Sequence, residues 1–248
     1  MKNYWDSPLI NASTLKKFTG DLDPAIAKHE LLHPKPPSEA MTLGTLVHDL
    51  MENEGIRSDK FVISPFPDFR TKAAKEWKKE MLETGRVILP EPVREQAEDM
   101  AAAISMQAPA WMFTGEYSNE QAFYTDKYKC LCDRVHHDRK AVIDWKTTRA
   151  RSAREFTREC VSYGYYLQAS FYLRVTGLNE FWFVAVSSVA PYPVWTFKAS
   201  EQALAYGKQQ WEKALENLEN SRPEEAGYWE ELEAPRWFEE SVEDVFEI

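Results

Sequence analysis

The chain has 248 residues, of which 44% are hydrophobic, and these values are typical of one globular domain with additions. No run of residues is long or apolar enough to span a membrane, and the N-terminus lacks a signal-peptide pattern, so we expect a cytoplasmic protein without membrane contact. Its three cysteines suit a reducing compartment and are too few for a four-cysteine iron–sulfur cluster.

The net charge of −10 is unevenly distributed along the chain. Residues 201–248 hold 14 acidic and 4 basic side chains, whereas residues 1–200 hold 26 of each sign. Residues 127–174 hold 11 basic and 5 acidic side chains. Because phosphate binding depends on the local field, the acidic balance of the whole chain does not exclude a nucleic-acid partner.

In the N-terminal half of the chain, the residue pattern predicts helices that are separated by proline-rich breaks. Asn11, Ser13 or Thr14 can cap a short helix that ends before Gly20. Further helices are predicted over residues 24–32, 38–53, 71–83 and 93–107, and residues 61–69 are predicted as a loop or an edge strand.

The segment 38–53 has the pattern of an amphipathic helix. Its apolar residues recur at helical spacing, at Leu43, Leu46, Val47 and Leu50. His48 lies beside this stripe, and Gly44 lies one turn earlier on the same face, where it leaves room for an imidazole or a metal ion.

The C-terminal half predicts most of the strands. They are expected over residues 119–125, 128–136, 140–146, 180–189 and 193–197, with helices over 151–160, 163–175 and 200–220. This order predicts an α/β core, a mixed β-sheet flanked by helices on both faces. We expect one domain over residues 1–220, followed by an acidic, aromatic-containing segment over 221–248 that packs within an oligomer or docks a partner.

Residues 129–147 contain two apolar-rich runs around a short polar turn, which predicts a β-hairpin. Side chains alternate along a strand, so Asp144 and Lys146 share one face and Trp145 takes the other. Asp133 lies on the neighbouring strand. Asp144 follows three apolar residues, and a buried carboxylate needs a partner or a metal. The convergence of two carboxylates and a lysine predicts a divalent-metal site suited to phosphodiester hydrolysis.

Four motifs follow one another along the chain. They are Gly44-Thr-Leu-Val-His48, Asp133, Asp144-Trp-Lys146 and Gln168-Ala-Ser-Phe-Tyr172. As a set they resemble the RecB-type branch of the PD-(D/E)xK nuclease superfamily, most of all its phage exodeoxyribonuclease VIII-like (RecE-like) exonucleases. The resemblance extends over residues 10–198, and it implies a restriction-endonuclease-like core in which a central mixed sheet is flanked by helices.

The resemblance also assigns roles to the motif residues. It implies that the metal is held by His48, Asp133, Asp144 and the backbone carbonyl of Trp145. It further implies catalytic roles for Lys146, Asp133 and Asp144, a contact of Glu120 with a second metal or its water, and an orienting role for Gln168 and Tyr172. Considered by themselves, His48 could be a core histidine, Glu120 a surface residue, and Gln168 with Tyr172 part of a helical core stripe.

The same resemblance implies a Mg²⁺-dependent exonuclease, with Mn²⁺ as a substitute and without an iron–sulfur cluster. It would digest double-stranded DNA ends processively from 5′ to 3′ in the cytosol of a bacterial host and generate single strands for phage-type recombination. A ring-shaped homo-oligomer, tetramer ahead of trimer, and a single-strand annealing protein are the implied partners. The alternatives are a structure- or end-specific endonuclease and a non-catalytic DNA-end-binding module.

Overall fold

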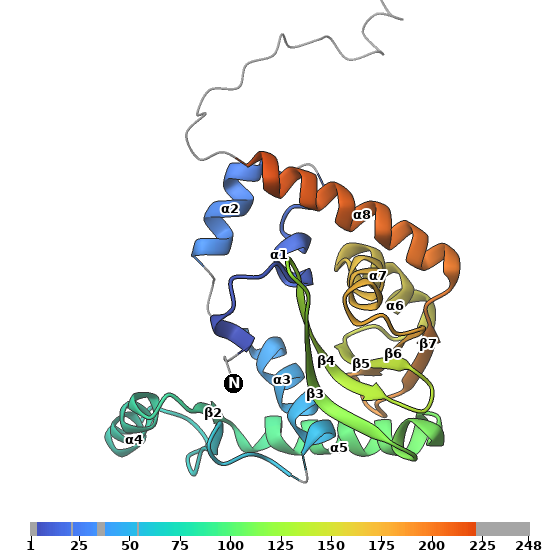
Figure 1. Cartoon of the computed structure of the whole chain (residues 1–248). Helices are drawn as coiled ribbons and strands as arrows, with labels where there is room; N and C mark the ends of the chain where they lie inside the picture. Colours follow the sequence, from blue (N-terminus) through green and yellow to red (C-terminus); the bar gives the residue numbers. More distant parts are fainter. Residues whose placement is uncertain (1–3, 21, 34–37, 54, 222–248) are drawn as a thin grey trace, which may run out of the picture.

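The centre of the molecule is a five-stranded sheet with the order β3-β4-β5-β6-β7 (Figure 1). The computed structural model of the chain describes residues 4–20, 22–33, 38–53 and 55–221. The strands are β3 (Tyr117–Tyr124), β4 (Lys129–His136), β5 (Ala141–Thr148), β6 (Glu180–Ser187) and β7 (Val194–Lys198). Strands β5 and β6 run parallel and the other neighbours antiparallel, which confirms the predicted mixed sheet.

Each face of the sheet carries its own hydrophobic core, because the side chains of the central strands alternate between the two. On β5, Val142 belongs to one core, whereas Ile143 and Trp145 belong to the other. The first core includes residues of α1 (Ala12–Lys16), α2 (Pro24–Leu32), α6 (Ala153–Ser162), α7 (Tyr165–Thr176) and α8 (Glu201–Asn220). The second includes residues of α3 (Glu39–Glu52) and α5 (Glu91–Gln107).

Trp145 anchors the second core. Its side chain is fully buried. Its ring lies nearly parallel to that of Phe113, which belongs to the short 3-10 helix η2 (Ala110–Phe113), and the ring centroids are 6.1 Å apart. Truncation of such an aromatic side chain costs about 3–5 kcal/mol of stability. The same packing fixes the direction of the neighbouring side chains on β5, which face the opposite way.

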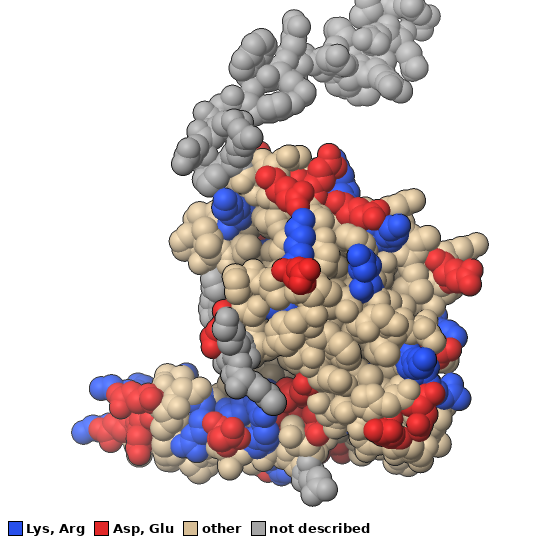
Figure 2. Space-filling model, in the orientation of Figure 1, with Lys and Arg blue, Asp and Glu red and all other residues tan. Residues whose placement is uncertain are grey.

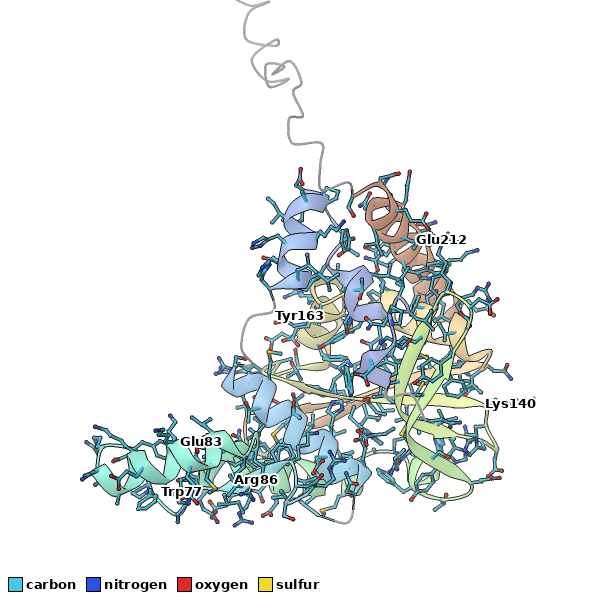
Figure 3. All side chains as sticks on the ribbon, turned by 60° about the vertical axis from the view of Figure 1, so that its left-hand side comes forward. Trp77, Glu83, Arg86, Lys140, Tyr163 and Glu212 are labelled. Carbon is cyan, nitrogen blue, oxygen red and sulfur yellow. The ribbon has the colours of Figure 1, made fainter. Side chains whose placement is uncertain are left out.

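A small arm projects from the body (Figures 1 and 3). It consists of β1 (Phe61–Ile63), α4 (Lys72–Glu83) and β2 (Val87–Leu89), and the two strands pair in parallel. The sequence pattern does not reveal β2, because three residues are too short to show a period. Figure 2 shows lysines and arginines interspersed with acidic side chains over the arm.

The sequence predicts where the domain ends and that the chain has no membrane-spanning segment. Helix α8 ends at Asn220, where the predicted domain ends, but residues 222–248 of the acidic segment lie outside the described residues. Within the described residues, no helix combines the length and the apolar character needed to cross a bilayer. A further 3-10 helix, η1 (Tyr4–Asp6), precedes α1.

Strands β4 and β5 separate at the point where their register would place two aspartates opposite each other. Their ladder pairs His136 with Ala141 and ends with Arg134 opposite Ile143. The next partners in this register would be Asp133 and Asp144, which do not pair. Instead, the Asp133 carboxylate accepts a hydrogen bond from the backbone N–H of Trp145 at 3.0 Å. The fork between the two strands therefore opens at the two predicted metal ligands.

Candidate metal centre and active site

Helix α3 brings His48 to the fork between β4 and β5. The helix begins after Ser38, whose hydroxyl accepts a hydrogen bond from the backbone N–H of Met41, and it packs closely on β5 at Gly44. A Cβ atom at Gly44 would lie 2.9 Å from the Thr147 hydroxyl, so glycine permits this approach. One turn later, His48 Nδ1 lies 3.3 Å from Asp133 Oδ2.

Glu52 joins these two residues. One potential ligand atom from each of His48, Glu52 and Asp133 can be chosen so that all lie within 4.8 Å of one another. Glu52 follows His48 by four residues, and this spacing places both side chains on one face of α3. Glu52 was not among the ligands predicted from the sequence, although its position one turn after the predicted histidine ligand was the available signal.

The three groups differ in how the site affects their protonation. Burial opposes protonation of His48, but the Asp133 carboxylate outweighs it and raises the pKa of His48. Burial would raise the pKa of Asp133, but His48 and Lys146 bring it below its ordinary value. Burial, together with Asp133, raises the pKa of Glu52 to about 8. A divalent cation would relieve the repulsion between these acidic groups.

Asp144 and Lys146 lie on the same face of β5, as the alternation of the strand predicted. The Lys146 amine forms an ion pair with Asp144 Oδ2, and the aspartate side chain is only 3% exposed. Burial raises the pKa of Asp144, although Lys146 acts in the opposite direction. Gln168 Nε2 donates a hydrogen bond to Asp144 Oδ1 at 2.5 Å. Gln168 thus fixes the orientation of the carboxylate.

Lys16 supplies a second amine that the sequence analysis did not identify. It lies on α1, and its Nζ donates a hydrogen bond to Gln168 Oε1 at 2.8 Å. The Gln168 amide therefore connects Lys16 to Asp144. Burial and the nearby Lys146 charge lower the pKa of Lys16 to about 7. A lysine in a short helix resembles an ordinary solvated residue, so its sequence context carries no signal of this position.

Glu120 and Tyr172 lie at the margin of this arrangement. Glu120 has a φ of 47° and interrupts the β3–β4 ladder opposite Asp133. Its carboxylate lies 3.9 Å from Arg57 Nη1 and lies outside the three-residue cluster of the described residues. The Tyr172 ring packs edge-on against Phe181, with 5.9 Å between the centroids. The structure brings neither side chain into a direct contact with Lys146 or Asp144 in the described part of the chain.

The residues at the fork fit a divalent cation. Carboxylate oxygens suit Mg²⁺ and Mn²⁺, and an imidazole nitrogen adds a ligand that transition metals accept readily. Asp133, Glu52 and His48 form one cluster, and Asp144, which is not part of this cluster of described residues, lies on the neighbouring strand. Trp145 contributes its backbone N–H to Asp133, whereas metal binding by its carbonyl stays a prediction.

The mixed sheet, the forked strands and the Asp-x-Lys arrangement on β5 define a PD-(D/E)xK-type domain. Residues 11–230 match the family described as "PDDEXK-like domain of unknown function (DUF3799)", so the chain belongs to this family. The match confirms the resemblance found in the motifs. A search among curated proteins gave no significant match.

The chain is similar to solved structures. A candidate exonuclease from Eubacterium rectale aligns with 16% identity over 100% of this chain and 98% of its own, with a TM-score of 0.60. A phage-related exonuclease from Haemophilus somnus 129PT aligns with 12% identity over 85% of this chain and 93% of its own, with a TM-score of 0.39. The first likeness confirms the restriction-endonuclease-like fold; at this identity it shows the fold alone.

Proposed function

We propose that the protein is a Mg²⁺-dependent deoxyribonuclease that digests double-stranded DNA from its ends. The observation that carries this proposal is the fork between β4 and β5. It places the Asp144–Lys146 pair beside the cluster of His48, Glu52 and Asp133. Membership of a PDDEXK-like family supports the same chemistry.

The residues at the fork have distinct tasks in this proposal. Asp133, Asp144, His48 and Glu52 would hold the cation, which supplies charge stabilisation for the phosphate and activation of a water molecule. Lys146 donates a hydrogen bond to the attacking water or to a phosphate oxygen and offsets the charge that develops in the transition state. Gln168 keeps Asp144 oriented, and the Trp145 N–H does the same for Asp133.

The finer part of the proposal rests on the motif resemblance. We propose processive 5′→3′ digestion that leaves single-stranded DNA for phage-type recombination, a ring-shaped homo-oligomer and an annealing protein as partner. The locally basic segment 127–174, which includes β4, β5 and α6, supports contact of this region with DNA. Mn²⁺ is expected to replace Mg²⁺, because both accept carboxylate ligands.

The test compares an end-labelled linear duplex with a covalently closed circular plasmid, each with Mg²⁺, with Mn²⁺ and with a chelator. We expect metal-dependent loss of the linear duplex, first from its 5′ ends, and no cutting of the closed circle. Asp144→Asn should reduce the rate by about 10³-fold or more, because it weakens charge stabilisation worth several kcal/mol. Circular dichroism checks that this variant is folded.

Two results would change the conclusion. Rapid cutting of the closed circle would favour the endonuclease. Metal-independent retention of DNA ends without any cleavage by the parental protein would favour the non-catalytic binding module. An Asp144→Asn protein that digests linear DNA at the parental rate would show that the fork is not the active site.

A further inference from the structure

Lys16 contacts the site but does not belong to the cluster of His48, Glu52 and Asp133. Its amine is bonded to the buried Gln168, and it lies 5.1 Å from the centroid of the Tyr165 ring. Lys146 lies 4.9 Å from the same centroid. The amines from α1 and β5 therefore both lie near one aromatic ring, and the charge of Lys146 acts on Lys16.

The local backbone makes room for the Lys16 side chain. Gly164 caps the N-terminus of α7 with a φ of 62°, and a Cβ atom there would lie 3.2 Å from Lys16 Cγ. The aliphatic part of the lysine thus crosses the start of α7, and its amine reaches the first turn of that helix at Gln168. The course of this side chain is fixed by packing on α7 and by the Gln168 hydrogen bond.

The charges around Lys16 point to an anion. The neighbouring Lys17 has a carboxylate partner, since it lies 3.7 Å from Glu30, and Lys146 pairs with Asp144. Lys16 instead bonds to a neutral amide, and it forms no ion pair within the described residues. Two amines held close together repel each other, and an anion between them would reverse this cost.

The aromatic side chains next to Lys16 extend to the molecular surface. Tyr163, labelled in Figure 3, is 57% exposed, and its ring centroid lies 5.8 Å from that of Tyr165. The aromatic wall beside the two lysines therefore continues to the surface of the molecule. Aromatic side chains of this kind accept nucleobases by stacking, and the lysines beside them suit the phosphates of the same strand.

We infer that Lys16 is a substrate-binding cation whose amine contacts a phosphate of the bound DNA strand next to the linkage served by Lys146. The inference rests on the proposed function, because it places DNA at the fork. Gln168 holds the amine in position and keeps it apart from Asp144. Lys16 thereby adds a phosphate contact that does not depend on the metal ligands.

The test compares Lys16→Met, Lys16→Arg and Lys17→Met in DNA binding. Affinity for a short duplex is measured by fluorescence anisotropy in Ca²⁺, under conditions in which no cleavage is detected, across a series of salt concentrations. Lys16→Met should weaken binding about tenfold, as expected for a lost hydrogen bond to a charged group. It should also lower the salt slope by about 0.9, the value for one phosphate contact. Lys16→Arg should restore most of the affinity, and Lys17→Met should change it by less than about twofold.

A second series locates the contact. Single linkages of the duplex are replaced one at a time by neutral methylphosphonates, and the binding loss caused by Lys16→Met should vanish on the duplex that lacks the contacted charge. The melting temperature and the Mn²⁺ affinity of Lys16→Met, the latter measured by calorimetry, should equal those of the parental protein.

Three results would overturn the inference. They are an unchanged salt slope, an equal loss on every methylphosphonate duplex, and a lowered Mn²⁺ affinity without loss of DNA affinity. The last would show that Lys16 only positions Gln168 and Asp144. A parental protein that binds no DNA would refute the proposed function itself, whereas a parental protein that binds DNA no better than Lys16→Met would refute this inference alone.

Discussion

Asp133 and Asp144 lie next to each other in the fork but have different partners. Asp133 accepts the Trp145 N–H and lies beside His48, and its pKa is lowered. Asp144 contacts Lys146 and Gln168, and burial raises its pKa. Asp133 therefore ionises more readily than Asp144 before a metal ion binds, although the two residues have similar sequence contexts on their strands.

Glu52 gives the metal-free protein a pH-dependent stability. Its folded-state pKa of about 8 exceeds the ordinary value of 4.5. At a pH between these two values, Glu52 is therefore protonated in the folded protein and ionised in the unfolded chain. The contribution of Glu52 to the free energy of unfolding is fully present below pH 4.5 and is lost as the pH rises toward 8. Glu52→Gln should raise the melting temperature at pH 8, by about 2–4 °C for each 1 kcal/mol of relieved repulsion.

Thermal denaturation between pH 5 and 8, with and without Mn²⁺, measures this effect. Mn²⁺ should raise the melting temperature of the parental protein more at pH 8 than at pH 6, because binding requires the ionised carboxylate. Glu52→Gln should respond less to Mn²⁺ at both values. Glu95→Gln, on an exposed position of α5, serves as the matched control. If Glu52→Gln keeps the parental pH dependence, Glu52 does not act in the way described.

The sequence could predict the residues whose type and position are unusual for their element. Asp144 interrupts an apolar strand and His48 borders an apolar stripe, so both stand out. Lys16 does not, since charged residues near helix ends are ordinary, and Glu52 is marked only by its spacing of four residues from His48. Their approach to the site depends on how α1 and α3 are placed in three dimensions, which periodicity alone does not determine.

At the scale of elements, the packing of α7 on α8 supports the site, because α7 carries Gln168 (Figure 1). Gly207 of α8 lies against the backbone of α7, and a Cβ atom at this position would lie 1.9 Å from the Tyr166 carbonyl oxygen. The clash is with backbone atoms, which cannot rotate away. The two helices would have to separate to admit any side chain.

Gly207→Ala should therefore destabilise the protein, although alanine is the better helix former by about 1 kcal/mol. Overpacking against a rigid neighbour costs about 1–3 kcal/mol, occasionally more, and here it should exceed the gain in propensity. Urea denaturation measures the change, with Gln209→Ala at an exposed position of the same helix as control. An equal or higher stability for Gly207→Ala would mean that the two helices are not packed as closely as described.

Most elements could be predicted from patterns because they are long and amphipathic. Helix α5 and strands β4 and β5 match their predicted segments closely. The pairing of β1 with β2 could not be predicted, because both strands have three residues and are joined through α4. The fork between β4 and β5 could not be predicted either, because the alternation of apolar residues does not show where a ladder of hydrogen bonds ends.

At the scale of the whole molecule, the charge distribution sets the geometry expected for DNA binding. Residues 127–174 carry a local excess of basic side chains, 11 against 5, whereas residues 201–248 are strongly acidic. DNA should approach the first region and avoid the second. An assembly that turns the basic regions inward would surround a duplex with positive charge.

We expect a ring-shaped homo-oligomer, with four chains ahead of three. Multi-angle light scattering at micromolar concentration, with and without duplex DNA, should give a mass close to four times the chain mass of 28.8 kDa. A mass of one chain under both conditions would contradict this expectation. The measurement separates assembly from catalysis, because Asp144→Asn should form the same oligomer as the parental protein.

The hydrogen bond between Lys16 and Gln168 joins residues that are 152 positions apart, and His48 and Asp133 are also distant in the chain. Loops of this length close late, because their entropy must be overcome before the contacts form. A chain emerging from the ribosome would lack the Gln168 link between Lys16 and Asp144 until α7 is complete. The nuclease activity proposed for this site should therefore appear only after the last long-range contact has formed, so unfinished chains would leave DNA uncut.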